Sequence, residues 1–202
     1  KCREKAVNIY VVRHGQTEEN LKGTYYGALD CGLTDLGVSQ AKVLGERLKD
    51  IKFDKVYCSD LKRAGETLKY INTIEEVFVD ERLRERNFGV FEGKTFKEIE
   101  KEFAEECIAW NDDWKDFRPC GGESFRDSYL RVEAFMENLK EETGENILVC
   151  THGGIVRAMY VYILEGNLDV YWKFGSRNAD LSIIKNQSGY FYIDSIIPLE
   201  VV

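Results

Sequence analysis

Prolines, histidines and surplus basic charge are all scarce in this chain of 202 residues. With two prolines and 44% hydrophobic residues, it has the composition neither of a Pro-rich linker nor of a disordered segment, and its length suits one ordinary domain. Asp and Glu total 36 against 28 Lys and Arg, so the formal net charge is −8. Because nucleic acids and anionic membranes attract basic proteins, we expect neither as a partner, and an anionic ligand would need a local cationic pocket.

Long apolar segments are also missing. The longest run, from Ile155 to Leu164, is interrupted by Arg157 and is too short to cross a bilayer. No signal segment is expected at the start, since Arg13 and His14 end the apolar run that begins at Ala6. The six cysteines form no C-x-x-C pair, and two histidines give a zinc site little material. We therefore expect a cytoplasmic protein with reduced thiols and without a metal or cofactor, whose oligomeric state the sequence leaves open.

Apolar strand patterns alternate with helical patterns, which predicts an α/β sandwich with a mostly parallel sheet. Strands are expected at 7–12, 55–58, 76–79 and 146–150, followed by a hairpin of 181–184 and 190–193. Helical spacing of apolar residues predicts helices over 34–51, 60–71, 124–139 and 153–164. Thr34 and Ser124 are expected as N-caps of the first and third helices, and Ser59 or Asp60 as the N-cap of the second.

The middle of the chain, roughly Asp80 to Gly122, has no strong strand pattern and is rich in aromatic and charged residues. It is typical of short helices and loops inserted over one end of the sheet. We expect a single domain over 1–202 with a lid-like insertion at about 87–123.

The only two histidines, His14 and His152, each follow a buried-strand pattern directly and each precede a glycine. If the two strands are parallel neighbours, both imidazoles emerge at the carboxyl end of the sheet, where ligands bind in such folds. A structural role is the usual interpretation of a single histidine, but the paired pattern favours a site.

Cationic side chains are predicted beside the first histidine. Arg13 and His14 at a strand end, followed by Gly15, suit a tetrahedral anion that approaches the backbone closely. Asn20 could present an amide donor to the same place. Arg63 lies early in the second helix, where a solvated arginine would be the ordinary alternative.

These residues resemble the histidine phosphatase superfamily, also called phosphoglycerate mutase-like. The matching blocks are Arg13-His14-Gly15, Ser59 to Ala64, Leu83-Arg84-Glu85 with Phe88-Gly89, and Thr151-His152-Gly153-Gly154, in the order of that family. The resemblance implies a three-layer α/β/α sandwich with a helical insertion over the C-terminal ends of the strands. It also implies a phosphomonoesterase that works through a phosphohistidine intermediate.

The resemblance assigns roles by position. His14 is implied as the nucleophile, and Glu85 as the proton donor to the leaving alcohol. Arg13, Arg63 and His152 are implied as the pocket for the phosphate oxygens. Gly15, Asn20 and Gly153 are further expected phosphate contacts.

Within the superfamily, several segments are similar to α-ribazole phosphatases, which remove the 5′-phosphate of α-ribazole phosphate or adenosylcobalamin phosphate. They include Leu83 to Gly93 and Gly121 to Phe125. Trp110 and Trp114 suggest stacking on a benzimidazole-type base, or alternatively packing of the insertion onto the domain. A broad-specificity phosphatase, a phosphoglycerate mutase and a non-catalytic sensor of phosphorylated ligands are the other possibilities.

Overall fold

The computed structural model describes residues 6–71 and 76–199. Six strands form one sheet in the order β3-β2-β4-β1-β5-β6. Four strands pair in parallel, namely β1 (Val7–Arg13), β2 (Lys55–Cys58), β3 (Val77–Val79) and β4 (Asn146–Thr151). β5 (Leu181–Gln187) pairs antiparallel with β1, and β6 (Tyr190–Ile197) pairs antiparallel with β5 at the edge of the sheet. The predicted α/β sandwich with a mostly parallel sheet is confirmed.

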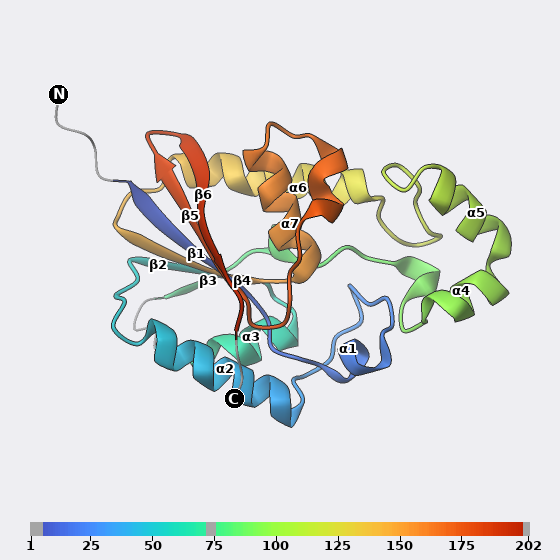
Figure 1. Cartoon of the computed structure of the whole chain (residues 1–202), viewed down its shortest axis with the longest axis horizontal. Coiled ribbons are helices and arrows are strands. Elements are labelled where there is room, and N and C mark those ends of the chain that lie inside the picture. Colours follow the sequence, from blue (N-terminus) through green and yellow to red (C-terminus); the bar gives the residue numbers. More distant parts are fainter. Residues whose placement is uncertain (1–5, 72–75, 200–202) are drawn as a thin grey trace.

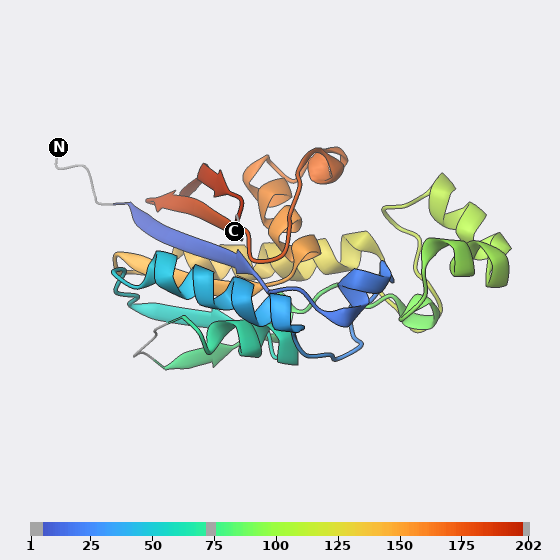
Figure 2. The same ribbon diagram turned by 60° about the horizontal axis from the view of Figure 1, so that its bottom comes forward.

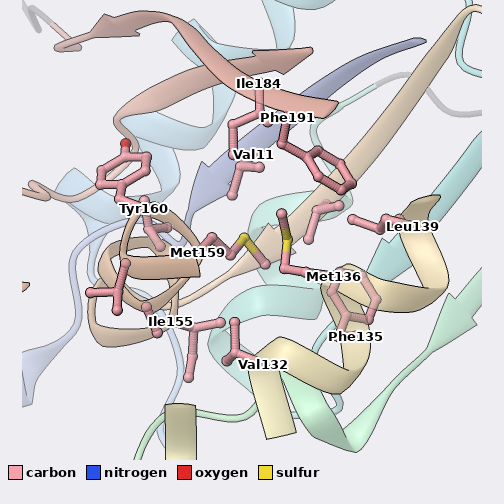
Figure 3. Close-up of a cluster of buried hydrophobic side chains, with 14 of the residues drawn as sticks. Val11, Val132, Phe135, Met136, Leu139, Ile155, Met159, Tyr160, Ile184 and Phe191 are labelled. Atoms are coloured by element: carbon pink, nitrogen blue, oxygen red, sulfur yellow. The ribbon is translucent and has the colours of Figure 1, made fainter. Parts of the chain in front are cut away.

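Helices cover both faces of this sheet (Figure 1). On one face lie α2 (Asp35–Leu48) and α3 (Lys62–Leu68), and on the other lie α6 (Phe125–Lys140) and α7 (Gly153–Ile163). Each helix packs an apolar stripe against the sheet, so the core is split into two layers. Figure 3 shows the layer between α6, α7 and the sheet, where Met136 and Met159 approach Val11 and Ile184.

Side-chain caps explain where two of these four helices, α2 and α6, begin. The Thr34 and Ser124 hydroxyls accept hydrogen bonds from Gly37 and Asp127, as predicted. The cap expected for α3 is wrong, because its N-cap is Leu61, which has no capping side chain. Asp30, distant in sequence, instead accepts a 2.8 Å bond from the Lys62 amide, which a local pattern cannot reveal.

The middle segment folds into short helices with loops between them. These are η1 (Glu81–Leu83), η2 (Gly89–Phe91), α4 (Phe96–Glu102) and α5 (Ala104–Asp112). Figures 1 and 2 show α4 and α5 set apart from the sheet, on the side toward which the parallel strands run. The chain also forms a short helix α1 (Glu18–Lys22), which the sequence analysis did not predict, and a final turn η3 (Leu168–Lys173). Within the described ranges, no helix is long and apolar enough to cross a membrane.

Candidate active site

The register of the two central strands brings the histidines together. β1 pairs with β4 so that Arg13 lies opposite Thr151, and the His14 amide donates to the Thr151 carbonyl at 2.9 Å. The next residue on each strand is a histidine, and the two ring centroids are 5.2 Å apart. Both side chains are buried, with 2% of His14 and 0% of His152 exposed.

His14 is held in one tautomer by its own backbone. Its Nδ1 lies 2.7 Å from the Gly15 carbonyl oxygen, which can only accept, so Nδ1 carries the proton and Nε2 keeps its lone pair. Burial, together with the positive charges of Arg13 and Arg63, lowers the pKa of His14 well below its usual value. The ring is therefore neutral and nucleophilic near pH 7.

His152 takes the opposite tautomer. Arg63 donates from Nε to His152 Nδ1 at 3.1 Å, so the proton of the ring is on Nε2, which lies 2.8 Å from the Ser59 hydroxyl. Burial and the Arg63 charge lower the pKa of His152 well below its usual value. Ser59, considered above as a helix cap, instead orients this imidazole from the end of β2.

Arg63 is fully buried, so the solvated-arginine alternative is wrong. Its Nη1 donates to the Leu29 carbonyl at 3.0 Å and its Nη2 to the Gly27 carbonyl at 2.8 Å, while its guanidinium lies 4.7 Å from the Tyr26 ring centre. A guanidinium has five N–H donors, and these bonds together with the one to His152 use three. Two donors remain for a ligand.

Glu92 fixes the loop that holds Arg63. Its carboxylate accepts hydrogen bonds from the amides of Gly27, Ala28, Leu29 and Phe88, all at 2.8–3.0 Å. The carbonyls of Gly27 and Leu29 are thereby directed at Arg63. Gly27 must be a glycine, because a Cβ there would lie 1.6 Å from the Arg86 carbonyl oxygen. Glu92 was not among the predicted site residues, because its only signal in the sequence is its place in the Leu83 to Gly93 block.

Arg13 and Gly153 lie against each other. A Cβ at Gly153 would approach the Arg13 guanidinium to 3.2 Å, so the glycine allows the close packing. Arg13 donates from Nη1 to the Ser176 carbonyl, and its buried Nε has no partner within the described residues. Burial lowers the pKa of Arg13 from a very high value, and its charge remains.

Glu85 is oriented by two backbone amides. Its Oε2 accepts from Gly154 at 2.8 Å, and its Oε1 accepts from Arg86 at 3.0 Å. A Cβ at Gly154 would lie 2.3 Å from Glu85 Oε1 and 3.0 Å from the Tyr171 hydroxyl. The second glycine of the His152-Gly153-Gly154 motif therefore makes room for the carboxyl group, which the motif alone did not explain.

Gly15 and Asn20 differ in what they offer a ligand. The Gly15 amide donates to Thr67 Oγ1 at 3.0 Å and its carbonyl holds His14, so Gly15 positions the histidine and has no free amide for phosphate. Asn20 is the N3 residue of α1, and its Oδ1 accepts from Thr17 and Asn178. That orientation leaves the side-chain nitrogen of Asn20, Nδ2, available to donate to a ligand.

A cavity of about 340 Å³ lies beside this cluster. Six of the predicted site residues line it, namely Arg13, Asn20, Glu85, Trp110, Trp114 and Gly153. His14, Gly15, Arg63 and His152 are not among its lining residues. The rest of its wall is largely aromatic and cationic, with Tyr25, Tyr26, Arg86, Phe88, Phe125, Arg157, Tyr171 and Trp172, and it also includes Thr24, Gly154 and Ser176.

The two tryptophans both pack and line the cavity. Trp110 lies among Tyr25, Phe88, Phe91 and Phe117, with ring centroids 5.2–6.5 Å away. Trp114 follows the end of α5 and packs on other rings, those of Phe125, Tyr171 and Trp172. The two tryptophans therefore do not share one helix face, and each packs a different part of the insertion against the rings of the cavity wall.

The chain is similar to known proteins over nearly its whole length. Residues 9–197 match the model of the histidine phosphatase superfamily, branch 1. The chain is 33% identical to an adenosylcobalamin/α-ribazole phosphatase of Salmonella typhimurium, over 91% of this chain and 93% of that protein. It is also 33% identical to phosphoserine phosphatase 1 of Hydrogenobacter thermophilus, over 88% and 86%. The crystal structure of the α-ribazole phosphatase of Shigella flexneri superimposes with a TM-score of 0.89 at 29% identity, over 96% of this chain and 100% of that one.

Proposed function

The chain belongs to branch 1 of the histidine phosphatase superfamily, and we propose that it is a phosphatase that hydrolyses phosphate monoesters through a phosphohistidine at His14. We further propose α-ribazole 5′-phosphate, or adenosylcobalamin phosphate, as its substrate. The observation that supports the mechanism best is the bond from His14 Nδ1 to the Gly15 carbonyl, which leaves a neutral Nε2 beside two arginines.

In the first step, His14 Nε2 attacks phosphorus and the bond from phosphorus to the ester oxygen breaks. An alkoxide is a poor leaving group, so Glu85 transfers its proton to the departing oxygen. In this proposal Arg13 and the two unused N–H donors of Arg63 bind the transferred phosphoryl group and stabilise the negative charge on its oxygens. In this proposal His152, paired with Arg63, completes the phosphate pocket.

In the second step, water attacks phosphorus and the N–P bond breaks, which releases inorganic phosphate. Glu85, now a carboxylate, takes the proton from the attacking water. The Gly154 and Arg86 amides keep this carboxyl group in one position for both transfers. No metal or cofactor takes part in the proposed sequence.

The aromatic wall of the cavity supports a substrate with a flat, apolar base. Tyr25, Phe88, Trp110 and Trp114 line the cavity that also contains Glu85, so a leaving alcohol protonated by Glu85 lies among these rings. Trp110 and Trp114 both come from the insertion, and we propose that this segment acts as a lid over the substrate. The α-ribazole phosphatases among the similar proteins support the same substrate.

The cellular setting is part of the proposal. The cysteines at positions 31, 58, 107, 120 and 150 are free thiols, which is typical of a reducing compartment and supports a cytoplasmic location. The sixth, Cys2, lies outside the described residues. The expected partner is a small phosphate ester.

The test compares kcat/KM for α-ribazole 5′-phosphate, O-phosphoserine, 3-phosphoglycerate and p-nitrophenyl phosphate, with His14→Ala as control. A preference of several orders of magnitude for α-ribazole 5′-phosphate would support the cobalamin substrate. A flat profile that His14→Ala abolishes would retain the mechanism and reject that substrate. Hydrolysis of none of the four would contradict the proposed function.

A further inference from the structure

Three buried polar atoms that belong to residues lining the cavity have no hydrogen-bond partner within the described residues. They are Arg13 Nε, Arg157 Nε and Ser176 Oγ, and their residues all line the cavity beside His14. Leaving a buried donor unpaired costs free energy, so such atoms are uncommon in native proteins. Their concentration in one cavity indicates a binding surface for a group that can accept hydrogen bonds.

Arg157 and Ser176 line the cavity that also contains Glu85, the proposed proton donor to the leaving alcohol. Arg157 lies one helical turn after Gly153 on α7, and its guanidinium is 5.6 Å from the ring centres of both Tyr171 and Trp172. The Tyr171 hydroxyl in turn lies close to the Gly154 and Glu85 pair. Ser176 is 8% exposed and lines the same cavity, and its backbone carbonyl accepts from Arg13.

The charges on the wall are unbalanced in the same place. Glu85 is the single carboxylate among the lining residues, against the guanidiniums of Arg13, Arg86 and Arg157. In the proposed function Arg13 and Arg63 face the phosphate, and Arg86 donates to the Glu123 and Phe117 carbonyls. No carboxylate of the described chain forms an ion pair with Arg157. This surplus positive charge stands out in a chain whose net charge is −8.

We propose that Arg157 and Ser176 form a specificity subsite for an oxygen substituent, a carboxylate or a hydroxyl, on the alcohol part of the phosphate ester. The proposal rests on the proposed function, because it places the phosphate on His14. A guanidinium donates to such oxygens through several N–H groups, and the Ser176 hydroxyl adds a single contact. Phosphate esters of plain hydrocarbon alcohols would leave these donors unpaired and bind more weakly.

The test measures binding, so that it does not depend on turnover. Dissociation constants are determined by calorimetry in the His14→Ala protein and in the His14→Ala/Arg157→Met and His14→Ala/Ser176→Ala proteins. One arm compares O-phosphoserine with O-phosphoethanolamine, which lacks the carboxylate. The other arm compares ribose 5-phosphate with 2-deoxyribose 5-phosphate, which lacks one hydroxyl. The two arms distinguish the two kinds of oxygen.

In at least one arm, we expect the oxygen-bearing ligand to bind tighter than its matched analogue in the His14→Ala protein. Arg157→Met should reduce that ratio by about 10- to 100-fold if the group is a carboxylate, and less if it is a hydroxyl. Ser176→Ala should reduce it by a smaller factor. Arg157→Lys, which keeps the charge and loses the planar fork, should restore part of the ratio.

Equal weakening of both ligands of each pair by Arg157→Met would overturn the proposal, since it would mean that Arg157 only packs on Tyr171 and Trp172. Unchanged binding of all ligands would overturn it as well. Arg126→Met, in an exposed ion pair with Asp116 outside the cavity, is the matched control. Failure of the proposed function is recognised separately, as absence of phosphate-ester hydrolysis in the wild-type protein.

Discussion

The two parts of the site are built by different means. In the histidine cluster at the strand ends, backbone carbonyls hold the nucleophile and the arginine, with His14 on the Gly15 carbonyl and Arg63 on the carbonyls of Gly27 and Leu29. The cavity wall is made of side chains that hold one another, mostly rings from the insertion and from η3. Backbone support tolerates little change in geometry, whereas ring packing accepts substitutions of similar size. Changes in the cluster should therefore affect every substrate, and changes in the wall should affect some substrates more than others.

The largest effect is expected from His14→Ala. Removing the proposed covalent nucleophile leaves only binding and positioning, so kcat should fall by about four orders of magnitude or more for every ester. Steady-state kinetics and acid-quench trapping of the phosphoenzyme measure this loss. Near-normal turnover in this variant would remove His14 from the mechanism.

Glu85→Gln should have the next largest effect, and its size should depend on the leaving group. General acid catalysis contributes about 10²–10⁴-fold, and an alkyl alcohol needs the proton more than p-nitrophenolate does. The rate on an alkyl phosphate should therefore fall much further than the rate on p-nitrophenyl phosphate. Equal losses on both esters would show that Glu85 does not protonate the leaving oxygen.

Glu92→Gln tests the loop that holds Arg63. The amide has one acceptor oxygen in place of two, so one or two of the four backbone N–H groups lose their partner and the Gly27 and Leu29 carbonyls shift. We expect kcat and the affinity for vanadate to fall together by about 10- to 100-fold, with the same factor for all substrates.

The matched control for Glu92→Gln is Glu98→Gln. Glu98 also accepts a backbone amide, that of Thr95, but caps α4 away from the cluster. The Glu98→Gln protein should lose a little stability and keep its activity. Glu92→Asp, which keeps both carboxylate oxygens, should retain part of the activity and vanadate affinity that Glu92→Gln loses. Unaltered vanadate affinity in Glu92→Gln would contradict a positioning role.

Trp110→Leu should have a smaller and selective effect. The leucine keeps much of the apolar volume but loses stacking, which is worth about 0.5–1.5 kcal/mol. Relative to p-nitrophenyl phosphate, kcat/KM for α-ribazole 5′-phosphate should fall by up to about tenfold. A uniform loss on both substrates would assign Trp110 to packing of the insertion alone.

The smallest effect concerns stability against pH. Both histidines are buried with pKa values below that of the unfolded chain, so below about pH 6.5 the unfolded state binds more protons. The contribution of the two histidines to the free energy of unfolding should be constant above that pH and decrease below it, by at most about 1.4 kcal/mol per pH unit for each histidine. Urea titrations of the wild type and His14→Asn measure the slopes, and identical slopes would contradict a depressed pKa for His14.

Local patterns predicted the parts of the fold that depend on neighbours in sequence. The continuous apolar run before Arg13 and the caps at Thr34 and Ser124 have local causes, and they were correct. The cap of α3 comes from Asp30, and the support of Arg63 comes from Glu92 through a loop about 65 residues earlier. Such contacts depend on how distant parts of the chain come together in the fold, and the spacing of residues in the sequence does not predict them.

The same limit applies to the site. The strand-His-Gly pattern predicted that His14 and His152 would meet if their strands were parallel neighbours, and the pairing of β1 with β4 meets that condition. It could not show that Gly15 serves the nucleophile instead of the phosphate, or that Arg157 and Ser176 face the cavity. These facts depend on side-chain directions, which are set by tertiary packing.

The pairing of β1 with β4 has a consequence for how this site can vary. Adjacent strands are about 4.8 Å apart, close to the 5.2 Å between the two imidazole centres. The spacing of the two rings is therefore a property of the sheet, and loops of any length can be attached around it without altering it. A one-residue insertion within β4 would rotate His152 to the opposite face of the sheet, so such a change would separate the two histidines completely and would not merely shift the distance between them.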